Sequence, residues 1–156
     1  MKITEHIQKG KENKKTLFSF EILPPVKGQD INSIYNAIDG LLEFNPSFID
    51  VTYHREEYAF RKNPDGSLVK YSTKKRPGTV AICSAIQNKY NIDAVPHLIC
   101  GGFTKEETEN ALIDLNFLGI DNILALSGDS IKGESSYLAN PEGNKNSVEL
   151  MSQIRD

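Results

Sequence analysis

The chain has 156 residues, enough for one domain with a hydrophobic core, and 25% of them are charged. The formal net charge of −3 gives no reason to expect a nucleic-acid-binding protein, since such proteins usually carry a basic face. Residues 1–16 are polar and rich in lysine, without the apolar stretch of a secretory signal. No apolar run approaches the roughly 18 residues that a transmembrane helix needs, so we expect a soluble, cytoplasmic protein without a membrane partner.

The two cysteines, Cys83 and Cys100, both lie in apolar runs. We expect buried free thiols, as in a reducing compartment. Together with His54 and His97 they could in principle bind zinc, but these residues lack the short-range spacing of zinc ligands, and no metal site is predicted.

The first βα unit follows a short polar segment, residues 1–14, which is expected to form a leading helix at 3–12 or to be flexible. A strand is predicted at 17–23, and it ends at Pro24-Pro25 because proline has no N–H for a strand ladder. A helix follows from about Asp30, with apolar residues at spacings of three and four.

The second unit begins with a predicted strand at 48–53. Residues 54–78 form a long polar loop or a hairpin, because the turn sequence Asn63-Pro64-Asp65-Gly66 lies between two short runs that can pair. A helix is predicted at 78–90, with apolar side chains on one face.

The third unit has a predicted strand at 92–100, in which Pro96 is unusual for a strand interior. Thr104 and Glu107 form a capping box that opens the next helix, and Gly119 suits its carboxyl-terminal stop.

The fourth unit has a strand at 122–126, a Gly- and Ser-rich loop at 127–145 and a last helix from Asn146. Strands that alternate with amphipathic helices predict an α/β protein with a parallel sheet. The sheet is either open and doubly wound or part of a (β/α)8 TIM barrel. A complete barrel needs roughly 250 residues, so residues 1–156 would form a single domain with the first four βα units, the N-terminal half of a barrel.

Polar residues gather at the carboxyl ends of the four predicted strands. Parallel α/β folds bind their ligands at that edge, so we expect the functional site there. The residues concerned are Glu21, Thr52, Tyr53, His54, His97, Ser127, Gly128 and Asp129.

Glu21 interrupts an otherwise apolar strand. Alternation places Phe18, Phe20 and Ile22 on one face and Ser19, Glu21 and Leu23 on the other. In a barrel Glu21 would point toward the mouth, and a carboxyl in a partly dry site can hold a proton near neutral pH and act as a general acid. The alternative is a structural carboxylate paired with a Lys or Arg.

Asp129 and His97 each allow two interpretations. A carboxylate at Asp129 can accept two hydrogen bonds from the N–H groups of a heterocycle, or it can form an Asx-turn at the start of a loop. His97 lies in an apolar strand, where it is either a core histidine with its own partners or a ligand-binding residue.

The segment 55–76 contains seven basic and three acidic residues. Such a segment near an active-site mouth can meet a nucleotide phosphate or a polyanionic substrate tail, or it can be a solvated loop. The chain has no GxGxxG sequence, no Walker loop and no Ser-His-Asp elbow.

Four segments together resemble methylenetetrahydrofolate reductase, in order and in spacing: 18–25 (FSFEILPP), 48–53 (FIDVTY), 96–100 (PHLIC) and 122–129 (NILALSGD). The similarity covers residues 15–156 and corresponds to the first half of the family's catalytic barrel. The resemblance implies an enzyme that uses FAD to pass a hydride from NADH or NADPH to 5,10-methylenetetrahydrofolate, giving 5-methyltetrahydrofolate.

The resemblance also implies roles for single residues. Glu21 corresponds to the catalytic glutamate, which gives a proton to the folate so that the ring opens to an iminium. Asp129 corresponds to an aspartate that faces both the pterin and the flavin. The expected cofactor-binding residues are Thr52, Tyr53, His97, Ser127, Gly128, Asp129 and, in the segment that aligns with a flavin-contacting part of the family, Ser147.

The sequence departs from the family in three places. Ser127 stands where the family often has arginine, residues 146–150 differ from the family's flavin-contacting segment, and 54–78 is longer than in many relatives. The later barrel strands, with their further flavin and folate contacts, lie beyond the similarity, so we expect little activity from this chain alone and either self-association or pairing with a complementary half barrel. Two other hypotheses remain: a non-catalytic piece that pairs with such a half, and an unrelated barrel enzyme that binds a phosphorylated substrate through the basic segment.

Overall fold

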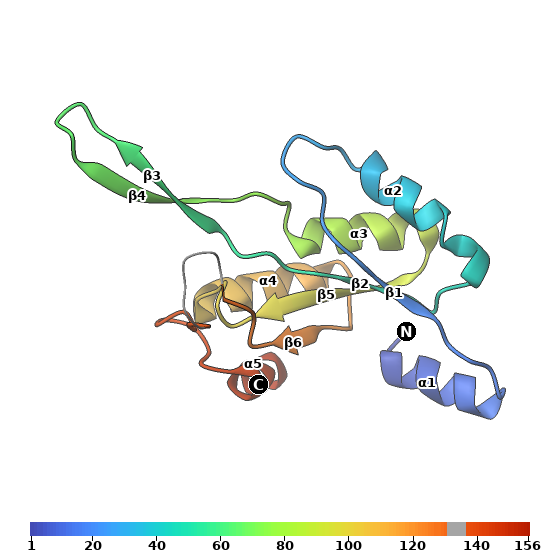
Figure 1. The fold of residues 1–156 in the computed structure, drawn as a ribbon. Helices are drawn as coiled ribbons and strands as arrows, with labels where there is room; N and C mark the ends of the chain where they lie inside the picture. Colours follow the sequence, from blue (N-terminus) through green and yellow to red (C-terminus); the bar gives the residue numbers. More distant parts are fainter. Residues whose placement is uncertain (131–136) are drawn as a thin grey trace.

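Four parallel strands form the main sheet of the chain, and they are arranged in the order in which they occur in the sequence. The structure is a computed structural model that describes residues 1–130 and 137–156, apart from the side chain of Ser72. The strands are β1 (Ser19–Ile22), β2 (Phe48–Val51), β5 (Asp93–Ile99) and β6 (Leu124–Leu126), and their order in the sheet is β1-β2-β5-β6 (Figure 1).

This strand order distinguishes between the two predicted architectures. A doubly wound sheet reverses its strand order at one point, whereas the described strands advance in one direction without a reversal. Right-handed crossovers then place the connecting helices on one face, as in a barrel. The prediction of an α/β fold built from the first four βα units of a TIM barrel is confirmed.

The helices follow the strands in the expected alternation (Figure 1). The leading helix predicted at 3–12 is present with those bounds, whereas the helix predicted from about Asp30 begins at Asn32. Their bounds are α1 (Ile3–Glu12), α2 (Asn32–Asp39), α3 (Thr79–Tyr90), α4 (Lys105–Phe117) and α5 (Ser147–Arg155), with a 3₁₀ turn at Leu42–Phe44.

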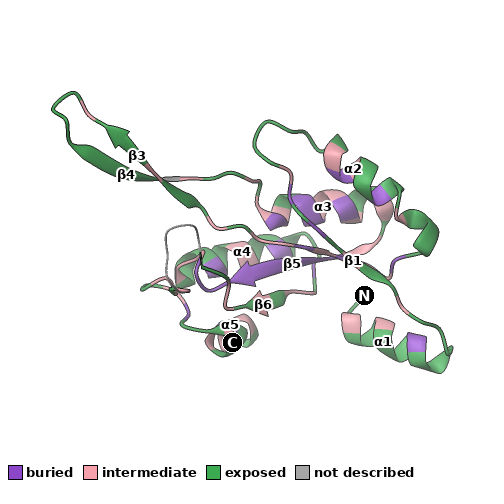
Figure 2. Ribbon diagram, in the orientation of Figure 1, coloured by how far each residue is buried: buried purple, intermediate pink, exposed green. Residues whose placement is uncertain are grey.

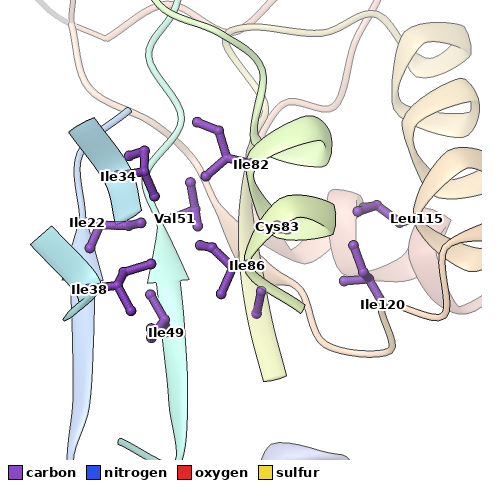
Figure 3. Close-up of a cluster of buried hydrophobic side chains, with 11 residues drawn as sticks. Ile22, Ile34, Ile38, Ile49, Val51, Ile82, Cys83, Ile86, Leu115 and Ile120 are labelled. Carbon is purple, nitrogen blue, oxygen red and sulfur yellow. The ribbon is translucent and has the colours of Figure 1, made fainter. Parts of the chain in front are cut away.

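The hydrophobic core lies between the sheet and the helices that follow it. Ile22, Ile49 and Val51 point from β1 and β2 into a cluster with side chains of α2 and α3 (Figure 3). Ile38, Ile49 and Ile86 are fully buried. A second cluster packs Leu98 and Cys100 against Leu150 of α5. Both clusters lie on the outer face of the sheet, which leaves the opposite face for polar side chains.

Pro96 is accommodated inside β5 because of the offset of β6. Val51 of β2 is the register partner of Pro96, but β6 joins β5 only at His97, which pairs with Leu124. At Pro96 the strand therefore pairs with β2 only. The missing N–H of the proline leaves no gap in the hydrogen bonds between β5 and β6.

Helix α4 begins and ends with two local motifs that fix its length. At its start the Glu107 backbone N–H donates to Oγ1 of Thr104 at 3.1 Å, and the Thr104 N–H donates to the Glu107 carboxylate at 2.8 Å, so the predicted capping box is present. At its end Gly119 has φ +68. The N–H groups of Gly119 and Ile120 donate to Asn116 O and Leu115 O, which is a Schellman motif.

Helix α1 lies against the amino-terminal ends of the strands, opposite to the predicted site. The Ile3 N–H donates to Oδ1 of Asn122 at 2.9 Å, and Nδ2 of Asn122 donates to Met1 O at 2.8 Å. These bonds attach the helix next to the start of β6.

The segment between β2 and α3 contains an antiparallel hairpin, β3 (Glu57–Lys62) and β4 (Leu68–Thr73). It projects from the body of the fold as an arm (Figure 1), and it is exposed along most of its length (Figure 2). Nζ of Lys70 lies 3.4 Å from the centre of the Tyr58 ring, and the guanidinium of Arg61 lies 5.4 Å from the centre of the Tyr71 ring. Cation–π contacts of this kind hold the exposed aromatic side chains against the arm.

The remaining sequence expectations concern thiols, membrane segments and the loop after β6. Cys83 and Cys100 are both buried and free, as predicted, and burial raises the pKa of each thiol. Among the described residues, no helix has the length and apolarity to cross a membrane. The predicted loop at 127–145 falls partly on residues 131–136, which lie outside the described residues.

Candidate active site at the carboxyl ends of the strands

A cavity of about 480 Å³ opens at the carboxyl ends of the four parallel strands. Seven of the predicted site residues line it together: Glu21, Thr52, Tyr53, His54, His97, Gly128 and Asp129. Ser127 and Ser147 are not among its lining residues. Leu23, Ile99 and Leu126 add apolar surface, so the cavity combines polar groups with the apolar wall that organic ligands favour.

Glu21 reaches the cavity because of the alternation along β1. Ile22 is 7% exposed and faces the core, so the neighbouring Glu21 points to the opposite face. The Glu21 side chain is 62% exposed. This chain therefore does not by itself supply the dry surroundings that the sequence analysis assumed for this carboxyl.

His97 extends from β5 across the sheet toward β1. Its Nε2 lies 3.8 Å from Oε2 of Glu21 and 3.8 Å from Oδ1 of Asp50, which is on β2. The imidazole is buried, and Nε2 has no hydrogen-bond partner. A buried polar atom without a partner is uncommon in folded proteins, so this nitrogen marks a place where a ligand or a side-chain movement supplies one.

Thr52 stands at the end of β2, where the chain leaves the sheet. Its N–H donates to Ile22 O at 3.1 Å, and its hydroxyl lies 3.4 Å from both Ile22 O and Nε2 of His54. Burial and the positive charge of Arg76 lower the pKa of His54. His54 therefore favours its neutral form, and its Nε2 lies within hydrogen-bond distance of the Thr52 hydroxyl.

Tyr53 is held beside the cavity by an aromatic neighbour and a glycine. Its ring centre lies 4.7 Å from that of Phe103, and a Cβ on Gly102 would come within 2.8 Å of its Cε1 atom. Burial, with the negative charges of Glu56 and Glu107, raises the pKa of Tyr53 to about 12, although Arg55 opposes the shift. The hydroxyl is therefore a hydrogen-bond donor at neutral pH.

Gly128 turns the chain sharply after β6 and directs Asp129 to the cavity. Its φ of +101 is a conformation that residues with a side chain rarely adopt. A Cβ there would also come within 3.3 Å of Ile99. The Gly-Asp sequence thus brings a carboxylate to the mouth on the side opposite to Glu21, since β1 and β6 are the two outer strands.

Two residues of the site, Asp50 and Arg55, were not predicted from the sequence as site residues. Arg55 lines the cavity, and Asp50 lies beneath it, next to His97. Asp50 is two residues before Thr52, so alternation along β2 places both on the inner face. That alternation was available in the sequence, although the short distance from Asp50 to His97 was not.

The described residues contain no group of three or more His, Cys, Asp or Glu side chains that could hold a metal ion, which gives no support to a zinc site. The cavity does fit one part of a flat heterocyclic cofactor. The partnerless Nε2 of His97 and the Thr52 hydroxyl offer hydrogen bonds, and Ile99 and Leu126 offer apolar contact.

Comparison with known proteins identifies the family of the chain. The sequence profile of the family described as methylenetetrahydrofolate reductase matches residues 3–156. The chain belongs to the methylenetetrahydrofolate reductase family. The resemblance inferred from the four sequence segments is thereby confirmed.

Curated members of the family are much longer than this chain. "Methylenetetrahydrofolate reductase (NADH) 1" of Arabidopsis thaliana is 28% identical over 99% of this chain and 24% of the relative. "Methylenetetrahydrofolate reductase 1" of Schizosaccharomyces pombe is also 28% identical, over 99% of this chain and 23% of the relative. "5,10-Methylenetetrahydrofolate reductase" of Escherichia coli is 30% identical over 71% of this chain and 32% of the relative. The chain spans about a quarter of the length of the plant and yeast reductases that it matches.

Proposed function

We propose that this chain forms the N-terminal half of the catalytic barrel of a methylenetetrahydrofolate reductase, and that the complete protein reduces 5,10-methylenetetrahydrofolate to 5-methyltetrahydrofolate with a hydride from NADH or NADPH. The observation that carries the proposal is the meeting of Glu21 and Asp129 in one cavity, at the strand ends where this class of fold binds its ligands.

In this proposal Glu21 is the general acid. It gives a proton to a ring nitrogen of the folate, so that a carbon–nitrogen bond breaks and leaves an iminium carbon that accepts the hydride. Asp129, at the other side of the mouth, accepts hydrogen bonds from the N–H groups of the pterin. The exposure of Glu21 falls when substrate, cofactor or further barrel strands cover the cavity, and this drying favours the protonated carboxyl that the step requires.

The cofactor in this proposal is FAD, which would supply hydride transfer between the nicotinamide and the folate carbon. The residues that would hold it are Thr52, Tyr53, His97, Ser127, Gly128 and Asp129, with Ser147 as a further contact. His97 lines the same cavity, and Tyr53 would donate a hydrogen bond from its hydroxyl.

The proposal is tested on the complete protein that carries this chain, with two assays. The first follows reduction of methylenetetrahydrofolate, and the second follows NADH- or NADPH-dependent reduction of menadione, which needs the cofactor but no folate proton donor. Glu21→Gln should lower the first by about 100-fold or more and leave the second within twofold of the wild type. Equal turnover of folate by the variant and the wild type would exclude Glu21 as the acid, and flavin absorbance of the purified protein checks the cofactor.

The same proposal includes the further strands that would pair with the outer strands of this sheet. β1 and β6 are the outer strands of the described sheet, and Leu23, Leu124 and Leu126 are exposed beside them. Open edges and apolar side chains favour pairing with further strands, supplied by a complementary half barrel or a second copy. Sedimentation of the 156-residue chain alone should show self-association, whereas full folate turnover by a monomer of this chain would contradict the proposal.

A further inference from the structure

Asp50 lies beside the proposed general acid Glu21 and has no role in the function proposed above. It is the register partner of Glu21, so the two carboxylates stand side by side on neighbouring strands and on the same face. Glu21 lines the cavity and Asp50 does not. A ligand in the cavity therefore meets Glu21, while Asp50 acts on the site only through its neighbours.

His97 connects the two carboxylates. Its Nε2 is equally far from both, at 3.8 Å from Oε2 of Glu21 and 3.8 Å from Oδ1 of Asp50, and it has no hydrogen-bond partner. One N–H can make one strong hydrogen bond at a time. Both distances exceed the usual length of a hydrogen bond by only about 1 Å, so the two carboxylates compete for the same donor.

The competition matters for the chemistry of Glu21. A hydrogen bond donated to a carboxyl oxygen favours the carboxylate over the carboxylic acid. If His97 donated to Glu21, it would oppose the protonated form that a general acid needs. If His97 donates to Asp50, the Glu21 carboxyl remains free to hold a proton and turn to the substrate.

Burial favours Asp50 in this competition. The Asp50 side chain is 18% exposed and the Glu21 side chain is 62% exposed. In the open cavity water solvates most of Glu21, whereas a poorly solvated carboxylate gains more from a protein donor. The interaction is also stronger where less water screens it.

We infer that Asp50 is a positioning residue, which accepts the Nε2–H of His97 and thereby keeps the imidazole away from Glu21. The consequence for folate reduction rests on the proposed function. The hydrogen bond itself does not, because it follows from the geometry of three side chains.

The first test measures the hydrogen bond without reference to activity. Nitrogen-15 NMR of histidine-labelled complete protein resolves the imidazole signals, and loss of one signal in His97→Gln assigns His97. Asp50→Leu should shift the Nε2–H signal of His97, whereas Glu21→Gln should leave it in place. The reverse pattern, a shift with Glu21→Gln and none with Asp50→Leu, would overturn the inference.

A second variant and a matched control keep the test decisive. Asp50→Asn keeps an acceptor oxygen but loses the charge, so it should move the His97 signal in the same direction by a smaller amount, and it replaces Asp50→Leu if that variant does not fold. Asp93 is the control, because it is also a strand carboxylate beside a histidine, with Oδ2 at 2.7 Å from Nε2 of His6, but at the other end of β5. Asp93→Asn should leave the His97 signal unchanged.

The second test connects the hydrogen bond to catalysis. Asp50→Leu should lower kcat for folate reduction by about tenfold or more, the equivalent of one hydrogen bond to a charged group, with menadione reduction within twofold of the wild type. A parallel fall in both assays and in flavin content would show a purely structural role. If wild type reduces menadione but not folate, the proposed function fails, while the NMR result still decides the position of His97.

Discussion

The Asp93 carboxylate, at the start of β5, lies 2.7 Å from Nε2 of His6 in helix α1. Its other oxygen lies 2.7 Å from the amino group of Met1. Burial raises the pKa of Asp93, but the hydrogen bonds from Met1 and His6, with their positive charges, outweigh burial and lower it. One carboxylate thus attaches both the first residue and the first helix to the sheet.

This arrangement predicts a defined loss of stability in acid. Because the folded-state pKa lies below the usual value of 3.8, the contribution of Asp93 is fully present above that value and is lost as the pH falls below it. Urea unfolding followed by circular dichroism should show Asp93→Asn to be less stable by about 1–2 kcal/mol at pH 7. The difference should shrink below pH 4. A difference that is equal at pH 7 and pH 3 would contradict the assignment.

The core of the sheet predicts a second stability result. Ile49 is completely buried between α2, α3 and the sheet, so Ile49→Ala leaves a cavity and should cost about 2–5 kcal/mol in the free energy of unfolding. Ile113 on α4 is the matched control, because its side chain is 59% exposed. Ile113→Ala should change the stability by less than about 0.5 kcal/mol. Similar losses in the two variants would mean that Ile49 is not at the centre of the core.

The close approach of Gly102 to Tyr53 predicts that a substitution at Gly102 affects both the site and the stability of the fold. A Cβ at this position would lie 2.8 Å from Cε1 of Tyr53, so Gly102→Ala should push the Tyr53 ring away from Phe103 and the cavity. We expect a destabilisation of about 1–3 kcal/mol, together with weaker flavin binding by the complete protein. Gly40→Ala serves as the control, since the nearest atom to its Cβ would be 3.7 Å away, and it should preserve both properties. Unchanged flavin affinity in Gly102→Ala would separate Tyr53 from the cofactor.

The thermal stability of the protein should be insensitive to removal of the projecting hairpin. None of its residues belongs to either core cluster, and its strands pair only with each other in the described sheet. An isolated two-stranded hairpin is at best marginally stable in water. Replacing residues 57–73 by a short Gly-Ser linker should therefore leave the thermal midpoint of the complete protein within about 2 °C of the wild type. A large fall would show that the arm packs on a part of the protein beyond this chain.

Much of this fold could be predicted from the sequence because its signals are local. The capping box at Thr104, the glycine stop at Gly119 and the alternation around Glu21 each depend on residues a few positions apart. The α/β class followed from their sum, and the family was recognisable from four short motifs. The choice between an open sheet and a barrel was not local, because it depends on which strands become neighbours.

The site was predictable in part for the same reason. Chain order and strand ends indicated Glu21, Thr52, Tyr53, His97 and the Gly128-Asp129 turn. The relationship of Asp50 to His97 was not visible, because the imidazole reaches over an intervening strand and no sequence spacing encodes that reach. Likewise, nothing in the sequence indicated that Glu21 would be as exposed as it is.

The offset of β6 along β5, which accommodates Pro96, also tilts the site. The last residue of β1, Ile22, is level with Val51 and Pro96, whereas the last residue of β6, Leu126, is level with Ile99, three positions further along β5. At about 3.3 Å per residue, the rim of the sheet therefore rises by about 10 Å from β1 to β6. Glu21 stands at the low side of this slope and Asp129 at the high side. A flat ring that touches both carboxyl groups must lie obliquely across the strands, with one end deep in the sheet and the other near its upper edge.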